Sequence, residues 1–165
     1  MDQAPAKKVG YHIKDASFDD MQNILSMSKE FFTESNYNGF LTFSEEKLKN
    51  HLYMAWGEWP RSFVTKIINF DNEPIGYAHV QYDSIFTVEN VGNLYQFYIR
   101  QGNRGGIAAR ILRDAVDDQF EQWDCRIRYA ECGAGLDAKK NNMIFSNLWS
   151  KIGFEFLGTA LYKRG

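Results

Sequence analysis

The sequence predicts an α/β domain with a mixed sheet, in which strands and helices follow the order β-αα-βββ-α-β-α-β. Three observations support this prediction. Apolar residues recur at the helical period in several segments. Segments rich in β-branched and aromatic residues alternate with them. A glycine-rich turn joins an apolar strand to an amphipathic helix near the middle of the chain. We expect antiparallel pairs early and a parallel crossover in the middle.

The first half of the chain is expected to place two helices after one short strand. Residues 9–13 form this strand, residues 1–8 are a loose tail, and a single domain covers residues 9–165. Ser17 begins a helix whose apolar positions follow a period of about 3.6 residues. Those positions are Met21, Ile24, Leu25, Met27 and Phe31. Residues 34–39 break this helix, and Ser44 caps a second one that ends near residues 56–60.

The second half is expected to alternate strands and helices. Residues 62–70 and 75–82 form a hairpin around a turn at 71–74. A strand at 94–99 leads through the glycine turn into a central helix over 105–123. A strand at 126–132, a helix at 137–152 and a last strand at 154–163 complete the domain.

Composition narrows the possible classes of function. The 165 residues are 44% hydrophobic and 24% charged, as in an ordinary globular domain. A net charge of −2 argues against a general nucleic-acid binder, and we expect neither a membrane span nor a secretory signal. Cys125 and Cys132 do not make a disulfide framework, so a cytoplasmic location is expected. The aromatic content of 16% fits a filled core or an aromatic-lined substrate pocket.

The most informative feature is the turn that precedes the central helix. Gly102, Gly105 and Gly106 allow the backbone there to approach a ligand closely. The N–H groups in the first turn of the helix have no intrahelical acceptor, so they can hold an anion. The sequence therefore predicts a phosphate-binding turn.

Two motifs resemble those of the GNAT superfamily of acetyl-CoA-dependent N-acetyltransferases, and the resemblance covers nearly the whole chain. Asn103-Arg-Gly-Gly106-Ile-Ala108 is similar to the family's pyrophosphate turn, Q/R-x-x-G-x-G/A. The next register, Arg104-x-x-Ile107-x-Ala109, keeps the Arg and loses the Gly. The second motif is similar to the family's N-x-x-A-x-x-L-Y-x-K-L-G-F; it reads Asn142-x-x-Phe145-x-x-Leu148-Trp149-x-Lys151-Ile-Gly153-Phe154. The chain also looks somewhat like short acetyltransferases found in bacteriophage genomes.

The resemblance implies acetyl-CoA as the co-substrate and a small-molecule or peptide amine as the acceptor. In the family, the fourth strand carries a bulge and splays from the fifth, which frees backbone amides for the pantetheine arm and the acyl oxygen. The resemblance assigns the following positions to the cofactor: Phe97, Tyr98, Ile99, Arg104, Gly105, Gly106, Ile107, Ala108, Ala109, Asn142 and Trp149.

The leaving-group acid is a point where the sequence departs from the family. The family often has a Tyr at the position of Trp149, and an indole N–H cannot titrate at physiological pH. Tyr95, Tyr98 or Tyr162 then takes this role, or the thiolate leaves into water, or the protein binds without turnover. Tyr98 and Tyr162 are therefore the tyrosines proposed as catalytic residues.

The general base is expected on or beside the splayed strands. The family's acid on the fourth strand falls at Gln96, which is not a base, so Glu131 on the fifth strand is the first candidate and Glu34 the second. Glu34 and Tyr37 lie between the first two helices, where the family recognises its acceptor. They can bind a cationic amine by charge and by cation–π contact.

Other functions fit some of the same residues. The first is a GNAT-shaped module that binds acyl-CoA without turnover, and the second is an acetyltransferase acting on a nucleic-acid amine. A third reading uses Gly133-x-Gly135-x-x-Ala138, which fits a dinucleotide fingerprint. Only one strand follows it, which leaves no room for the repeated units of a Rossmann domain.

The sequence gives little indication of metal binding or of a dimer contact. His12, His51 and His79 share no ligand spacing, so no metal site is expected. Trp56, Trp59 and the loop at residues 85–91 are candidates for a homodimer contact, with packing inside one chain as the alternative.

Overall fold

The computed structural model describes residues 10–39, 41–57, 62–69, 71–83, 88–104, 106–130 and 138–155. Within these ranges the strands form one sheet in the order β1-β2-β3-β4-β5. The strands are β1 (His12–Asp15), β2 (Ser62–Ile68), β3 (Pro74–Asp83), β4 (Asn90–Ile99) and β5 (Cys125–Ala130). Neighbours from β1 to β4 pair antiparallel, whereas β5 runs parallel to β4. The predicted mixed sheet is confirmed.

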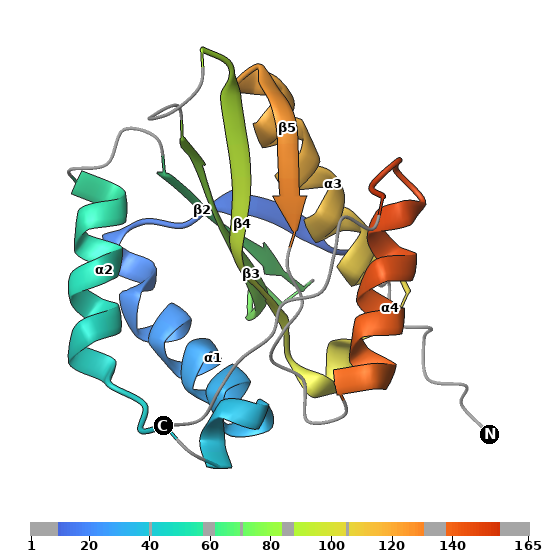
Figure 1. Ribbon diagram of the computed structural model, residues 1–165. Helices are drawn as coiled ribbons and strands as arrows, with labels where there is room; N and C mark the ends of the chain where they lie inside the picture. Colours follow the sequence, from blue (N-terminus) through green and yellow to red (C-terminus); the bar gives the residue numbers. More distant parts are fainter. Residues whose placement is uncertain are drawn as a thin grey trace.

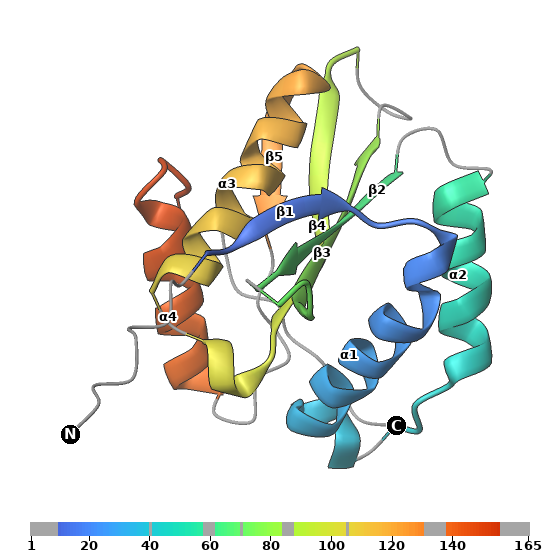
Figure 2. The same ribbon diagram turned by 180° about the vertical axis from the view of Figure 1, so that it is seen from behind.

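Helices cover both faces of this sheet (Figures 1 and 2). On one face lie α1 (Met21–Glu34) and α2 (Glu45–Gly57). On the other face α3 (Ile107–Gln122) crosses all five strands, with α4 (Ala138–Ser150) packed beside it. Short 3₁₀ turns, η1 (Phe18–Asp20), η2 (Asn36–Gly39) and η3 (Gln101–Asn103), connect these elements. None of the described helices is long and apolar enough to cross a membrane.

Each face of the sheet has its own apolar core. The core under α3 includes Leu112, Val116 and Phe120, all fully buried, and receives Trp149 from α4. The core under α1 and α2 includes Ile24, Met27 and Leu52 from the helices; Tyr77 and Tyr98 contribute from the sheet. Because each helix buries one apolar stripe, the helical periods in the sequence correctly predicted these contacts.

Local hydrogen bonds fix where the first two helices begin. The Ser17 amide donates to Oδ2 of Asp20 at 3.0 Å, and the other oxygen of Asp20 accepts from Nζ of Lys66 on β2. This start is therefore tied to the sheet as well as to its own backbone. Oγ of Ser44 accepts from the Lys47 amide at 3.3 Å, which confirms the predicted cap of α2.

Three boundaries differ from the prediction or fall outside the description. β1 spans His12–Asp15 rather than residues 9–13. β4 begins at Asn90 rather than at Leu94, because Gly92 interrupts the apolar pattern but not the strand. A Cβ atom at Gly92 would overlap the ring of Phe120 on α3, so a glycine is needed at this contact. The predicted last strand at 154–163 lies almost wholly outside the described residues, as does the N-terminal tail.

Candidate active site

β4 carries a bulge close to the end of its described pairing with β5. Tyr95 is an extra residue on β4, opposite the step from His79 to Val80 on β3. The described parallel ladder between β4 and β5 ends at the pair Leu94 and Ala130, and the residues that follow Ala130 lie outside the description. The expected bulge is confirmed, whereas the expected splay falls on residues outside the description and stays a prediction. A strand edge without a partner would offer backbone donors and acceptors to an extended ligand.

β4 leads into a turn that ends at the N-terminus of α3. Gly106 has a φ of 80°, and open space surrounds the position where its Cβ would lie. The amides of Gly106, Ile107 and Ala108 donate to no described residue. The Arg104 amide, by contrast, donates to the Gln101 carbonyl at 3.3 Å. Among the described residues, the donors available to an anion are therefore those from Gly106 to Ala108, at the positive end of the helix. This edge and turn fit a diphosphate that carries an extended arm.

The side chains around Tyr98 form an ionic network with α1. The Tyr98 hydroxyl lies 3.1 Å from Oε1 of Glu34 and 3.3 Å from Oε2 of Glu30. Arg100 pairs with Glu30 at 3.1 Å, Arg104 pairs with Glu34, and the Arg104 guanidinium lies 5.3 Å from the Tyr98 ring centre. Burial, reinforced by the charge of Glu34, raises the pKa of Tyr98. The phenol therefore stays protonated, with its hydrogen directed at α1.

The other predicted site residues fall into three groups. Glu34 is bound to Tyr98 and Arg104, so the predicted amine-binding carboxylate already holds a cation. Tyr37 lies on η2 with 38% of its surface exposed. Glu131, Tyr162 and Gly105 lie outside the described residues, and Asn142 lies on α4 with its side chain outside the description.

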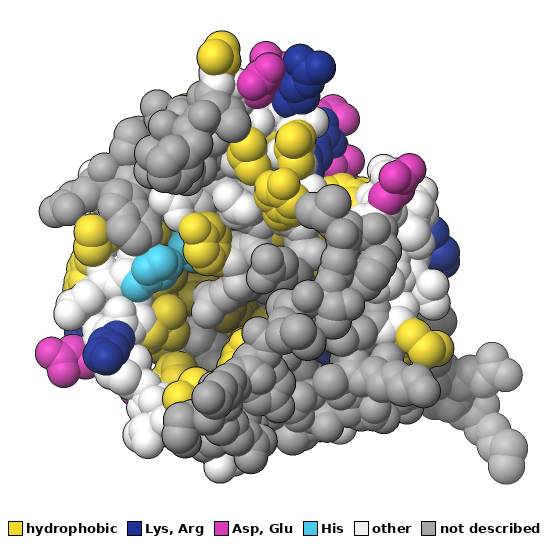
Figure 3. Space-filling model, in the orientation of Figure 1, with side chains coloured by type: hydrophobic (Ala, Val, Ile, Leu, Met, Phe, Trp, Pro, Cys, Tyr) yellow, Lys and Arg dark blue, Asp and Glu magenta, His cyan; other side chains and the backbone are white. Residues whose placement is uncertain are grey.

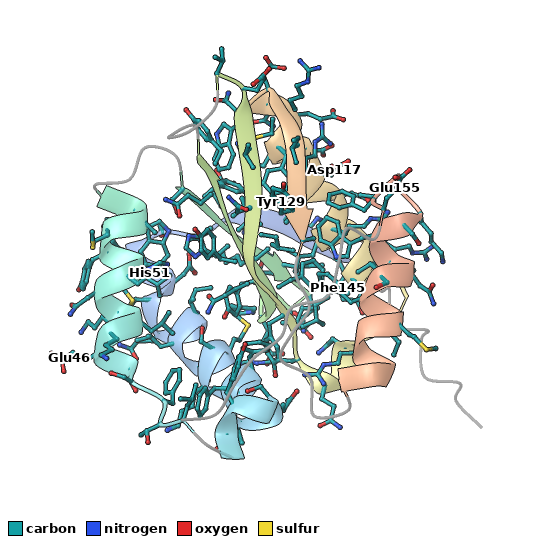
Figure 4. The ribbon with its side chains drawn as sticks, viewed as in Figure 1. Glu46, His51, Asp117, Tyr129, Phe145 and Glu155 are labelled. Atoms are coloured by element: carbon teal, nitrogen blue, oxygen red, sulfur yellow. The ribbon has the colours of Figure 1, made fainter. Side chains whose placement is uncertain are left out.

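Trp149 lies in an aromatic cluster between α4 and β4. Its ring centre is 5.9 Å from that of Phe97 on β4, 5.7 Å from Phe145 and 4.9 Å from Phe154. Figure 4 shows Phe145 pointing from α4 toward the ends of β4 and β5. Trp149 is only 2% exposed, and its indole N–H has no partner among the described residues. Trp149 is thus placed for packing and for donating a hydrogen bond, beside the bulged strand β4.

Two histidines that the sequence did not point to meet beside the bulge. The rings of His51 on α2 and His79 on β3 lie 5.1 Å apart, and the ring of Tyr95 stacks on His79 at 5.6 Å. Nε2 of His79 is 2.7 Å from Oγ of Ser62, whereas its Nδ1 has no partner among the described residues. No spacing in the sequence could reveal this pair, because the packing of α2 on the sheet creates it.

A second polar chain lies on the same face of the sheet. The Tyr77 hydroxyl is 2.7 Å from Oγ of Ser28 on α1 and donates to Oε1 of Gln96 at 3.1 Å. Gln96, at the position of the family's acid, is therefore held by a neutral phenol. Within the ranges that the structure covers, no cluster of three or more His, Cys, Asp or Glu side chains could hold a metal ion.

Several solved structures with a similar arrangement of elements are acetyltransferases. A CoA complex of the aminoglycoside N-acetyltransferase AAC(6')-Iy superposes with a TM-score of 0.74 at 14% identity, covering 99% of both chains. The chain has the GNAT fold. A glucosamine-6-phosphate N-acetyltransferase from Arabidopsis thaliana gives a TM-score of 0.70 at 12% identity, covering 94% of this chain and 98% of that one. An apo aminoglycoside 6'-N-acetyltransferase from Acinetobacter haemolyticus gives 0.67 at 17% identity, covering 93% and 97%.

Sequence comparison adds no closer relative. No protein-family model matches the chain, and no curated protein matches it. The GNAT fold is thus shared with structures at 12–17% sequence identity, a level at which the likeness concerns the arrangement of elements alone.

Proposed function

We propose that this chain is a GNAT N-acyltransferase that moves an acetyl group from acetyl-CoA to a primary amine by direct attack. The observation that carries this proposal is the path of the chain from the bulged β4 to the start of α3, where the amides of Gly106, Ile107 and Ala108 have no acceptor among the described residues. Acyl transfer needs a bound thioester whose carbonyl is held by fixed donors, and in this proposal the edge of β4 beyond Leu94 supplies them. The fold shared with an enzyme solved as a CoA complex supports the same conclusion.

The residues along this path take separate roles in the proposal. Gly106, Ile107 and Ala108 hold the diphosphate through their amides. The main chain of Phe97 to Ile99 holds the pantetheine arm, and Trp149 packs beside it. Acetyl-CoA supplies the activated acyl carbon, and the protein contributes orientation, which accounts for about 7–11 kcal/mol of barrier lowering in the best intramolecular reactions.

Tyr98 and Glu34 are better suited to positioning than to proton transfer. A phenol held against two carboxylates donates to them and keeps its proton. The same network links the end of α1 to Arg104 in the turn. We therefore assign this network to holding the turn in place. Tyr162 remains the proposed donor to the leaving sulfur, with water as the alternative.

Thermal stabilisation and thiol release test the proposal together. Acetyl-CoA should raise the melting temperature, whereas NAD at the same concentration should not, because a ligand that binds only the native state stabilises it. A panel of amines should then release free CoA thiol: an aminoglycoside, glucosamine-6-phosphate, spermidine and a lysine peptide. Stabilisation by NAD alone, or by neither compound, would refute the proposal.

A binding module without turnover is the second candidate. The observation that favours it is that neither Trp149, an indole, nor Gln96, an amide held by Tyr77, can titrate. Stabilisation by acetyl-CoA without thiol release from any amine of the panel would support this function instead.

A further inference from the structure

The imidazoles of His51 and His79 lie beside the bulge of β4. His79 is the cross-strand partner of Gln96 and stacks against Tyr95, the bulged residue of β4. His51 contacts His79 from α2, on the face of the sheet covered by α1 and α2. Figure 4 shows His51 pointing from α2 toward the strands, and Figure 3 shows histidine beside a hollow on the same side of the molecule.

The two histidines differ in what they can do. His79 is fully buried, its ring is fixed by Ser62, and burial together with the neighbouring His51 lowers its pKa to about 3. His51 is only partly buried, and burial lowers its pKa from the ordinary value of 6.5. Both rings are therefore neutral at pH 7, but only His51 reaches solvent. A neutral, partly exposed imidazole is a competent proton acceptor.

We propose that His51 is the general base of this site, which takes a proton from the acceptor amine beside the β4 bulge, against a wall formed by His79 and Tyr95. This inference rests on the proposed transferase function. It supplies the group that Gln96 cannot provide, and it competes directly with Glu131, the base predicted from the sequence.

An acceptor that arrives as an ammonium ion gives one proton to His51, which passes it to solvent. The neutral amine nitrogen then forms a bond to the acyl carbon as the carbon–sulfur bond breaks. The second proton of the nitrogen passes to the CoA sulfur. The products are an amide and free CoA thiol, with no oxidant or reductant involved.

Replacement of His51 separates proton transfer from binding. His51→Ala should lower kcat by about 100-fold or more, with the amine of the panel that the wild type acetylates fastest. The Kd for CoA, measured by calorimetry, should stay unchanged, because His51 lies away from the turn. Exogenous imidazole should restore part of the lost rate, which no purely structural role of His51 would produce. His12→Gln, at an exposed histidine on β1, is the matched control and should keep the wild-type rate.

The outcomes distinguish this inference from the proposed function. A wild type that binds no CoA, or turns over no amine, refutes the transferase and the base with it. A wild type that turns over an amine while His51→Ala keeps its kcat overturns the His51 assignment alone. In that case Glu131→Gln should lose the activity. The His51 assignment is also overturned if His51→Ala loses activity, imidazole does not restore the rate, and the melting temperature of the variant differs from that of the wild type.

Discussion

A charge introduced at Ile107 should separate the stability of α3 from its ability to bind a diphosphate. Ile107 is the first residue of the helix, is 53% exposed and belongs to the group of amides without an acceptor. A glutamate there lies at the positive end of the helix dipole. It should therefore stabilise the free protein by about 0.3–1 kcal/mol.

The same glutamate should oppose the bound diphosphate. Two unit charges about 4 Å apart interact by about 1 kcal/mol in water and about 4 kcal/mol at an effective dielectric constant of ~20. The exposure of Ile107 favours the lower part of this range, so we expect a loss of about 1–2 kcal/mol. This corresponds to binding weakened by about 5- to 30-fold.

Calorimetric titration with CoA and thermal melts of the free protein measure the two effects. Ile107→Gln has nearly the same shape without the charge, so it isolates the electrostatic contribution from the loss of the isoleucine side chain. Ile107→Glu should bind CoA more weakly than Ile107→Gln and melt at a higher temperature. Equal affinity of the two variants for CoA would show that no diphosphate lies at this end of α3.

Three further predictions concern stability. Gly76→Ala should lower the free energy of unfolding in urea by about 1–3 kcal/mol, because its Cβ would lie 2.6 Å from the Tyr98 carbonyl oxygen. Gly57→Ala, with open space around the new Cβ, is the control and should leave the free energy of unfolding unchanged. Equal effects of the two substitutions would contradict this packing. Leu112→Ala should cost about 2–5 kcal/mol, since the side chain is fully buried under the sheet, and a smaller loss would mean that the core closes over the cavity. His79 should make the fold acid-sensitive, because its pKa in the folded protein, about 3, lies below the ordinary value of 6.5. The contribution of neutral His79 to the free energy of unfolding is complete above pH 6.5. Below pH 6.5 it is lost by at most about 1.4 kcal/mol per pH unit. Urea unfolding between pH 7 and 5 should therefore show a steeper decline for the wild type than for His79→Gln, and parallel curves would refute the assignment.

Features that depend on neighbours in the chain were predictable. The Ser44 cap acts on an amide three residues away, and the hairpin turn is closed by Asn69, whose side chain accepts from the amides of Asp71 and Glu73. The free amides at the start of α3 also follow from local rules, since helix starts always leave N–H groups without an intrahelical acceptor. The sequence did not predict that the Arg104 amide donates to the Gln101 carbonyl within the turn.

Features that depend on register and packing were not predictable from the residues alone. The extra residue at Tyr95 exists only relative to the pairing of β3 with β4, and nothing in the local sequence marks it. The resemblance to a family supplied the expectation of a bulge, but not the residue that forms it. Likewise, nothing near Glu34 in the sequence predicts its partners. Its ion pair with Arg104 and its hydrogen bond from Tyr98 form only in the folded protein.

The sequence by itself determined the order of the elements, the apolar faces of the helices and the turn that can hold a phosphate, because each of these follows from contacts over a few residues. The tertiary structure decided which acids are already neutralised by arginines and which imidazoles meet at the bulged strand. These are contacts between elements far apart in the chain, and their chemistry depends on burial and distance that only the assembled sheet and helices create.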